Sequence, residues 1–196
     1  MQIARRKVVL GMAGLPLAAV LADPRLSWAA AQTLKNVSLT TDGGLSVAAA
    51  LAVPAATPAS AVLLVHEWWG LNDQIKSVAA DLAAQGYLAL AIDLYDGKVA
   101  TKADQARKFM GGVDGAAATD TVGSWLRWLK GHELASGKSA TIGWCFGGGW
   151  SLQTALILPG KIDAAVIYYG SLVTDPAMLK LLSMPILGIF GAEDRG

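Results

Sequence analysis

The chain of 196 residues is 54% hydrophobic and 16% charged, which supplies one buried core and excludes an intrinsically disordered chain. Its formal net charge is +1, but the first 31 residues hold four of the sixteen basic groups and one of the fifteen acidic groups. The remaining residues, 32–196, therefore carry a net charge of −2, which disfavours nucleic-acid binding.

The first 31 residues are typical of an export signal. Basic residues 5–7 precede an apolar run from Val8 to Leu21, and an Ala-x-Ala cleavage pattern ends at Ala31. The pair Arg5-Arg6 favours the twin-arginine route. The apolar run is shorter than the ~20 residues that a membrane span needs. We expect cleavage after Ala30 or Ala31, and a periplasmic or secreted product with no stable membrane span.

Residues 32–196 predict a single domain in which strands alternate with helices. Strands are expected at 34–40, 45–53, 61–66, 87–92, 139–144, 164–169 and 185–190. Helices are expected at 73–86, about 101–110, 114–130, 148–158 and 177–182, the first of them capped by Asp73. This alternation predicts an α/β fold, a mostly parallel sheet with an antiparallel start and helices on both faces.

Ligands of such folds bind at the carboxyl ends of the strands, and the first candidate there is the segment from Gly143 to Gly148. It places Cys145 at a strand–turn–helix junction with glycines two residues before and two after it, the pattern of a nucleophile elbow. A thiolate at a helix N-terminus is stabilised by the unpaired N–H groups. The backbone N–H of Phe146 is a candidate oxyanion donor.

Cys145 is the only cysteine in the sequence, so it cannot form an intramolecular disulfide. A lone cysteine is most often a small buried hydrophobic residue. The elbow pattern around Cys145 reverses that expectation and favours a nucleophile. A thiol redox protein is disfavoured because no second cysteine is present.

The second candidate is the segment from His66 to Gly70, directly after the third strand. A zinc site of the H-E-x-x-H kind would need histidine in place of Gly70, so we expect no metal. In the loop that donates the second oxyanion N–H in α/β-hydrolases, the candidate donor is Trp68. The same loop brings Glu67 close to the thiol.

The third candidate is the segment from Phe190 to Asp194, after the last expected strand. In α/β-hydrolases the acid of the triad follows the nucleophile and precedes the histidine, and Asp194 fits that order. Glu193 is the neighbouring alternative, and either carboxylate alone could be a solvated loop charge.

Together with Asp93-Leu94-Tyr95 after the fourth strand, these segments resemble the dienelactone hydrolase family from about residue 34 to 196. The resemblance implies an α/β-hydrolase fold and hydrolysis of lactones or related esters by a Cys-His-Asp triad, without metal or organic cofactor. It implies that Cys145 attacks the carbonyl and forms an acyl-enzyme. It also implies that Asp194 orients the histidine and that Glu67 helps to deprotonate the thiol.

The sequence departs from the family in two places. An arginine that holds the substrate carboxylate stands two residues after the tyrosine in family members, where this chain has Gly97 followed by Lys98. We therefore expect a broader ester or lactone specificity than dienelactone. No histidine follows Asp194, since the two histidines are His66 and His132. We interpret the chain as C-terminally truncated, lacking the last strand and helix, and expect little turnover.

The alternative function is a non-catalytic relic of the same fold that binds ligands or serves as a scaffold. The expected partner is a small-molecule ester or lactone, and the expected assembly is a monomer. His132 follows the helix at 114–130, where we expect a capping or surface role. Trp125 and Trp128 within that helix are expected to pack rather than to bind substrate.

Overall fold

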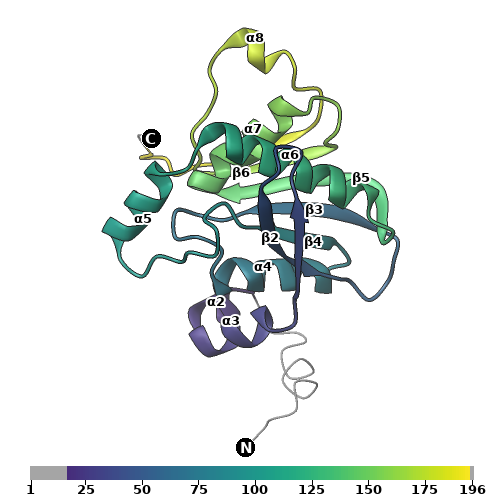
Figure 1. The fold of residues 1–196 in the computed structure, drawn as a ribbon, viewed down its shortest axis with the longest axis vertical. Helices are drawn as coiled ribbons and strands as arrows, with labels where there is room; N and C mark the ends of the chain where they lie inside the picture. The colour runs from purple at the N-terminus through teal and green to yellow at the C-terminus, as the bar shows by residue number, and fades with distance from the viewer. Residues whose placement is uncertain (1–16, 195–196) are drawn as a thin grey trace, which may run out of the picture.

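A computed structural model describes residues 17–194, whose helices and strands form a layered structure (Figure 1). All seven expected strands are present: β1 (Lys35–Thr40), β2 (Ser46–Ala52), β3 (Ala59–Val65), β4 (Leu88–Ile92), β5 (Ala135–Trp144), β6 (Ala164–Tyr168) and β7 (Ile186–Ile189). The helices are α2 (Leu17–Ala22), α3 (Pro24–Ala31), α4 (Asp73–Ala84), α5 (Ala103–Gly111), α6 (Gly115–Gly131), α7 (Phe146–Ile157) and α8 (Pro176–Leu179).

The strands form one sheet in the order β1-β2-β4-β3-β5-β6-β7. β1 pairs antiparallel with β2, and β2 pairs antiparallel with β4. The other four pairings are parallel. The mostly parallel sheet with an antiparallel start is therefore confirmed, and the carboxyl ends of β3, β4, β5, β6 and β7 meet at one edge, where the candidate residues follow their strands.

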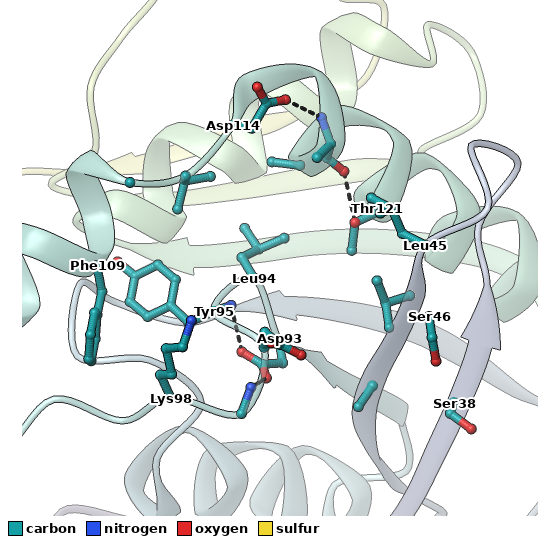
Figure 2. A pocket seen from close by; sticks show the side chains of 18 of the residues that line it. Ser38, Leu45, Ser46, Asp93, Leu94, Tyr95, Lys98, Phe109, Asp114 and Thr121 are labelled. Atoms are coloured by element: carbon teal, nitrogen blue, oxygen red, sulfur yellow. Dashed lines mark hydrogen bonds between the residues drawn. The ribbon is translucent and has the colours of Figure 1, made fainter.

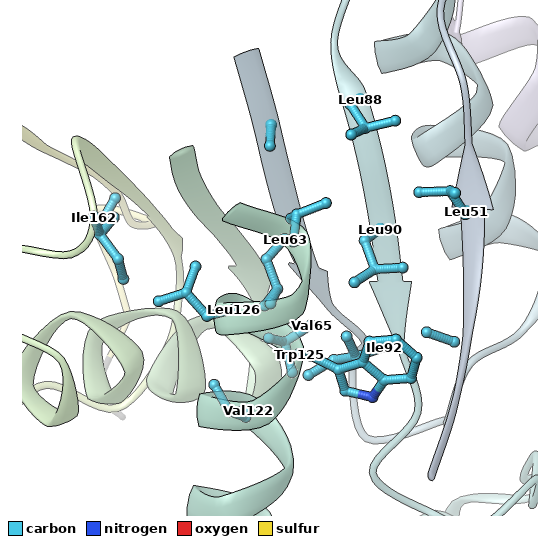
Figure 3. Close-up of a cluster of buried hydrophobic side chains, with 14 of the residues drawn as sticks. Leu51, Leu63, Val65, Leu88, Leu90, Ile92, Val122, Trp125, Leu126 and Ile162 are labelled. Carbon is cyan, nitrogen blue, oxygen red and sulfur yellow. The ribbon is translucent and has the colours of Figure 1, made fainter. Parts of the chain in front are cut away.

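Helices cover both faces of the sheet, with α4 below it and α6 and α7 above it in the view of Figure 1. The larger core lies under α6, which buries Val122, Trp125 and Leu126 against the side chains of β3 and β4 (Figure 3). A second, smaller core lies between α4 and the opposite face of the sheet, where Ile75 and Ala79 pack against the same strands. Trp125 is fully buried, as expected for a packing residue.

The cap of α4 and the start of α7 differ from the sequence-based expectation. The N-cap of α4 is Asn72 rather than Asp73, because the Asn72 side chain accepts the Ile75 N–H at 3.1 Å. Asp73 is instead the first helical residue, where its charge favours the helix dipole. α7 begins at Phe146, two residues earlier than expected, so Cys145 itself occupies the N-cap position.

The segment expected to be an export signal contributes α2 and α3, which pack against α4. Ser27, Ala30 and Ala31 are buried there, and the Ser27 hydroxyl donates to the Val20 carbonyl oxygen at 2.7 Å. The basic residues 5–7 lie outside the described residues. Among residues 17–194, no helix combines the length and apolar character needed to cross a membrane.

The sheet ends in a strand whose side chains are exposed. β7 pairs with β6 on one side, and every residue of β7 is exposed, including Leu187 at 55%. β7 is therefore an exposed apolar edge of the sheet in the described part of the chain. Such an edge offers unpaired backbone groups to another strand.

The start of α7 approaches the ends of β3 and β6 so closely that no side chain fits between them. A Cβ atom on Gly147 would lie 2.2 Å from the Val65 carbonyl oxygen, and one on Gly148 would lie 2.6 Å from the Tyr168 carbonyl oxygen. Both contacts are with backbone atoms, which cannot rotate away. These glycines therefore fix the position of the residue that precedes the helix, Cys145.

We predict that Gly147→Ala destabilises the protein by about 3 kcal/mol or more, because the new methyl group must displace the backbone of β3. Gly149→Ala is the matched control, since a Cβ there meets its nearest neighbour at an ordinary 3.6 Å. Gly149 lies inside α7, so alanine should leave stability unchanged or raise it by up to ~1 kcal/mol. Chemical denaturation of both variants checks this, and equal stabilities would contradict it.

Candidate functional site

Cys145 joins β5 to α7 in a strained backbone conformation. Its φ is 54° and its ψ is −117°, a region that residues with a Cβ rarely adopt. Backbone hydrogen bonds hold the conformation on both sides: the Cys145 N–H donates to the Tyr168 carbonyl at 3.0 Å, and the Cys145 carbonyl accepts the Gly149 N–H at 3.2 Å. Strain of this kind costs about 1–3 kcal/mol and is concentrated at functional sites.

Cys145 faces a cavity of about 700 Å³ at the carboxyl edge of the sheet. The cavity is lined by residues of α5, of α7, of the loop after β6 and of the turn after β7: Met110, Cys145, Phe146, Gly149, Trp150, Gln153, Tyr169, Gly170, Ser171, Leu172, Val173, Phe190 and Asp194. Three predicted site residues, Cys145, Phe146 and Asp194, are thus brought to the same cavity. Glu193 is not among the lining residues.

Glu67 reaches this site through a tyrosine that the sequence analysis did not select. The Tyr169 hydroxyl donates a hydrogen bond of 2.8 Å to Glu67 Oε1, and Tyr169 lines the cavity. Burial, together with the hydrogen bond to Glu67, raises the pKa of Tyr169, so its hydroxyl stays protonated and keeps donating. Tyr169 also has a positive φ of 37°. The sequence signal that could have identified Tyr169 is its position directly after β6, at the carboxyl end of a strand.

The predicted oxyanion donors lie at the ends of two strands. Phe146 is the first residue of α7, and the first N–H groups of a helix have no partner within it. Trp68 lies in the loop after β3, where its ring contacts that of Trp69 in a T-shaped arrangement with centroids 5.1 Å apart. Both assignments stay predictions.

His66 is fully buried at the end of β3, and both of its ring nitrogens are engaged. Nε2 accepts the Leu94 N–H at 3.1 Å, so the proton is on Nδ1, which donates to the Glu67 carbonyl at 2.6 Å. Burial lowers the pKa of His66, and the Glu67 hydrogen bond and the charge of Asp93 offset this only in part. His66 is therefore a neutral structural link between two strand ends.

His132 caps the C-terminus of α6, which confirms the expected capping role. Its Nδ1 accepts the Leu134 N–H at 3.2 Å, and its ring packs against Trp128 with centroids 4.7 Å apart. These contacts lie at the C-terminal end of α6, and His132 is not among the residues that line the Cys145 cavity. Neither histidine of the chain is therefore placed to serve Cys145 as a base.

The loop that follows β4 forms one wall of a second, larger cavity of about 850 Å³ (Figure 2). Asp93 organises this loop by accepting the N–H groups of Tyr95 at 2.8 Å and Gly97 at 2.5 Å. Tyr95 is buried against His66 and Phe146, and its hydroxyl has no hydrogen-bonding partner among the described residues. Lys98, singled out in the sequence, lines this cavity rather than the one at Cys145.

Comparisons with known proteins agree with this architecture. Residues 47–196 match the sequence model of the dienelactone hydrolase family. The carboxymethylenebutenolidase of Pseudomonas putida is 27% identical over 171 residues, which cover 82% of this chain and 72% of that protein. The protein usf of Aquifex pyrophilus is 32% identical over 142 residues, 68% of this chain and 61% of that protein.

A similar solved structure is that of a dienelactone hydrolase-like promiscuous phosphotriesterase from metagenomic libraries. It superimposes with a TM-score of 0.72 at 26% identity and covers 83% of this chain and 70% of that protein. The chain thus spans between 61% and 72% of the length of these three relatives.

The buried neutral His66 predicts a loss of stability in mild acid. Its folded pKa is depressed, so its contribution is complete above the unfolded value of about 6.5 and is lost as the pH falls below that value. The free energy of unfolding should therefore drop as the pH falls from about 6.5 to about 5.5, with a slope of up to about 1.4 kcal/mol per pH unit from this residue. Denaturant titrations at each pH measure the slope.

The His66→Gln variant should flatten this slope, whatever its absolute stability, because glutamine does not titrate. His132→Gln, which removes the other histidine of the chain, is the matched control. Carboxylates titrate mainly below this window and contribute little to it. A His66→Gln variant with the full wild-type slope would refute the assignment.

Proposed function

The chain belongs to the dienelactone hydrolase family of hydrolases, and we propose that it cleaves small carboxylic esters or lactones with Cys145 as the nucleophile. The observation that carries the proposal is the strained backbone of Cys145 at the N-terminus of α7, facing a cavity that Asp194 also lines. Packing needs no such conformation in a cysteine, whereas a nucleophile gains exposure from it.

In the proposed reaction the Cys145 thiol loses its proton to Glu67, and the thiolate attacks the carbonyl carbon of the ester. The negative charge that develops on the carbonyl oxygen is held by the N–H groups of Phe146 and Trp68. The carbon–oxygen bond of the ester then breaks, the leaving oxygen departs with the electron pair and takes up the proton held by Glu67 to give the alcohol, and a thioester remains on Cys145. The hydrogen bond from Tyr169 to Glu67 supports this arrangement because it keeps the carboxylate at the edge of the cavity.

The second half of the reaction needs a base to activate water against the thioester. Asp194 is the candidate to orient an imidazole for this step, but His66 has both nitrogens engaged and His132 caps α6. The complete triad therefore needs a histidine that residues 1–196 do not supply. We expect the chain to acylate and then to hydrolyse the thioester slowly.

Export is the second part of the proposal, supported by the order of charged, apolar and Ala-x-Ala segments in residues 1–31. Because Ala30 and Ala31 are buried against the rest of the fold, a peptidase can reach this site only when α3 is detached from α4. Protein recovered from the periplasm or the medium should begin at Ala31 or Gln32 by N-terminal sequencing. Exported protein that retains Met1 would contradict the proposal.

For the hydrolase itself we predict one equivalent of p-nitrophenol in a rapid burst from p-nitrophenyl acetate, followed by a much slower release. Cys145→Ala should abolish the burst and leave a release of p-nitrophenol that is at least ~10³-fold slower than the wild-type burst phase. Glu67→Gln should keep the burst but slow it by about 10²-fold, because the general base is lost. Stopped-flow absorbance measures all three proteins.

Imidazole in solution provides a second readout, since it can replace the missing base. Imidazole should accelerate the slow release of p-nitrophenol by wild-type protein about tenfold more than it accelerates release by Cys145→Ala. Cys145→Ala is the control because any acceleration there comes from direct attack of imidazole on the ester. A Cys145→Ala protein with an unchanged burst would refute the nucleophile. A wild-type protein with no burst that still binds ester would favour the non-catalytic alternative.

A further inference from the structure

The Tyr95 hydroxyl is a buried donor that the fold leaves without an acceptor. Tyr95 follows β4 and is only 5% exposed, and no atom of the described residues accepts a hydrogen bond from its hydroxyl. The side chains around it already enclose the oxygen, so its partner has to come from the groups packed against it. An unpaired buried hydroxyl costs free energy, and in a native protein it calls for an explanation.

Aromatic rings fix the side chain of Tyr95 next to the nucleophile. Its ring meets those of Phe146 and Phe109 at centroid distances of 5.6 and 5.9 Å, and Figure 2 shows it beside Phe109. Phe146 directly follows Cys145 at the start of α7. The third ring is that of His66, with centroids 4.6 Å apart. A tyrosine ring held by three others keeps its hydroxyl in one place.

The groups around Tyr95 leave the sulfur of Cys145 as the acceptor. Phenylalanine rings offer no oxygen or nitrogen, and His66 already uses the lone pair of Nε2 for the Leu94 N–H. The Asp93 carboxylate accepts the backbone N–H of Tyr95, whereas the hydroxyl lies at the opposite end of the side chain. A thiolate is a charged acceptor, and hydrogen bonds to charged groups are the stronger ones.

The electrostatics connect the same two groups. Burial raises the pKa of Tyr95, and the negative charges of Cys145 and Asp93 raise it further, so the hydroxyl keeps its proton and stays a donor. The influence of a charge falls with distance, which indicates that the Cys145 sulfur is close. The other tyrosine of the site, Tyr169, is not available to the sulfur because its hydroxyl already donates to Glu67.

We propose that the Tyr95 hydroxyl donates a hydrogen bond to the Cys145 sulfur when the thiol ionises, and that it thereby holds the nucleophile ready for attack. The sulfur turns about a single side-chain bond, so the contact forms without a change in the backbone. The thiol proton passes to Glu67, and Tyr95 keeps its own. This inference rests on the proposed function, in which Cys145 reacts as a thiolate.

The test compares wild type with Tyr95→Phe, which removes the hydroxyl and keeps the ring. Cys145 is the only cysteine, so alkylation by iodoacetamide, in which the thiolate forms a carbon–sulfur bond and iodide leaves, reports on it alone. In the variant, the midpoint of the alkylation rate against pH should rise by about one to two pH units, because the thiolate loses a hydrogen bond. The ultraviolet absorbance of the thiolate should titrate with the same displacement.

Tyr87→Phe is the matched control, since Tyr87 precedes β4 at the opposite end of the strand and is 39% exposed. Its alkylation midpoint should stay at the wild-type value. The carboxylates of Glu67, Asp93 and Asp194 and the neutral ring of His66 are the same in all three proteins, so their influence on the sulfur cancels from the comparison.

Chemical denaturation separates this role from a structural one. Because Tyr95→Phe removes a donor without an acceptor, it should leave the denaturation midpoint unchanged or raise it. A residue that serves packing alone would leave the alkylation midpoint where it is in wild type. A shift in alkylation with the stability retained therefore reports the hydrogen bond.

Failure of this inference and failure of the proposed function give different results. An unchanged alkylation midpoint in Tyr95→Phe would overturn the inference and leave the nucleophile in place. A raised midpoint, with an ester burst slowed about three- to tenfold at neutral pH, supports both. A raised midpoint in a chain that no ester acylates supports the hydrogen bond and refutes the proposed function.

Discussion

The close backbone contact between the start of α7 and the strands beneath it is the constraint on which the site depends. Gly147 and Gly148 let the helix touch the ends of β3 and β6, at distances where any Cβ would collide with a carbonyl oxygen. Cys145 is the residue that must connect β5 to a helix held in that position. Its positive φ follows from this geometry, and the buried core under α6 and α7 supplies the free energy that maintains it.

A second feature of the site is the separation of charges between the two cavities. Asp194 lines the cavity of Cys145 and Glu67 hydrogen-bonds to Tyr169 of its lining, whereas Lys98 and Lys108 line the neighbouring cavity. His66 adds no positive charge between them, because burial keeps its ring neutral. His66 is a structural link rather than a base because it is buried and its one free lone pair, on Nε2, already accepts the Leu94 N–H.

The fold could be predicted from the sequence because continuous apolar runs such as 61–66 and 87–92 specify buried parallel strands. The elbow was predictable for a similar reason, since the glycines around Cys145 are local in sequence. The starts of α4 and α7 were predicted less well, because a cap depends on which side chain reaches the helix rather than on periodicity. The contact between Tyr169 and Glu67 joins residues 102 positions apart, and no local pattern encodes it.

The central claim is that Cys145 is a nucleophile rather than a buried packing residue. The direct measurement is peptide mass spectrometry of the chain after a brief exposure to an activated ester and an acid quench. We predict one acyl group per chain, located on the peptide that contains Cys145 and removed by hydroxylamine at neutral pH, as expected of a thioester. An acyl group found on lysine or tyrosine side chains, with Cys145 unmodified, would contradict it.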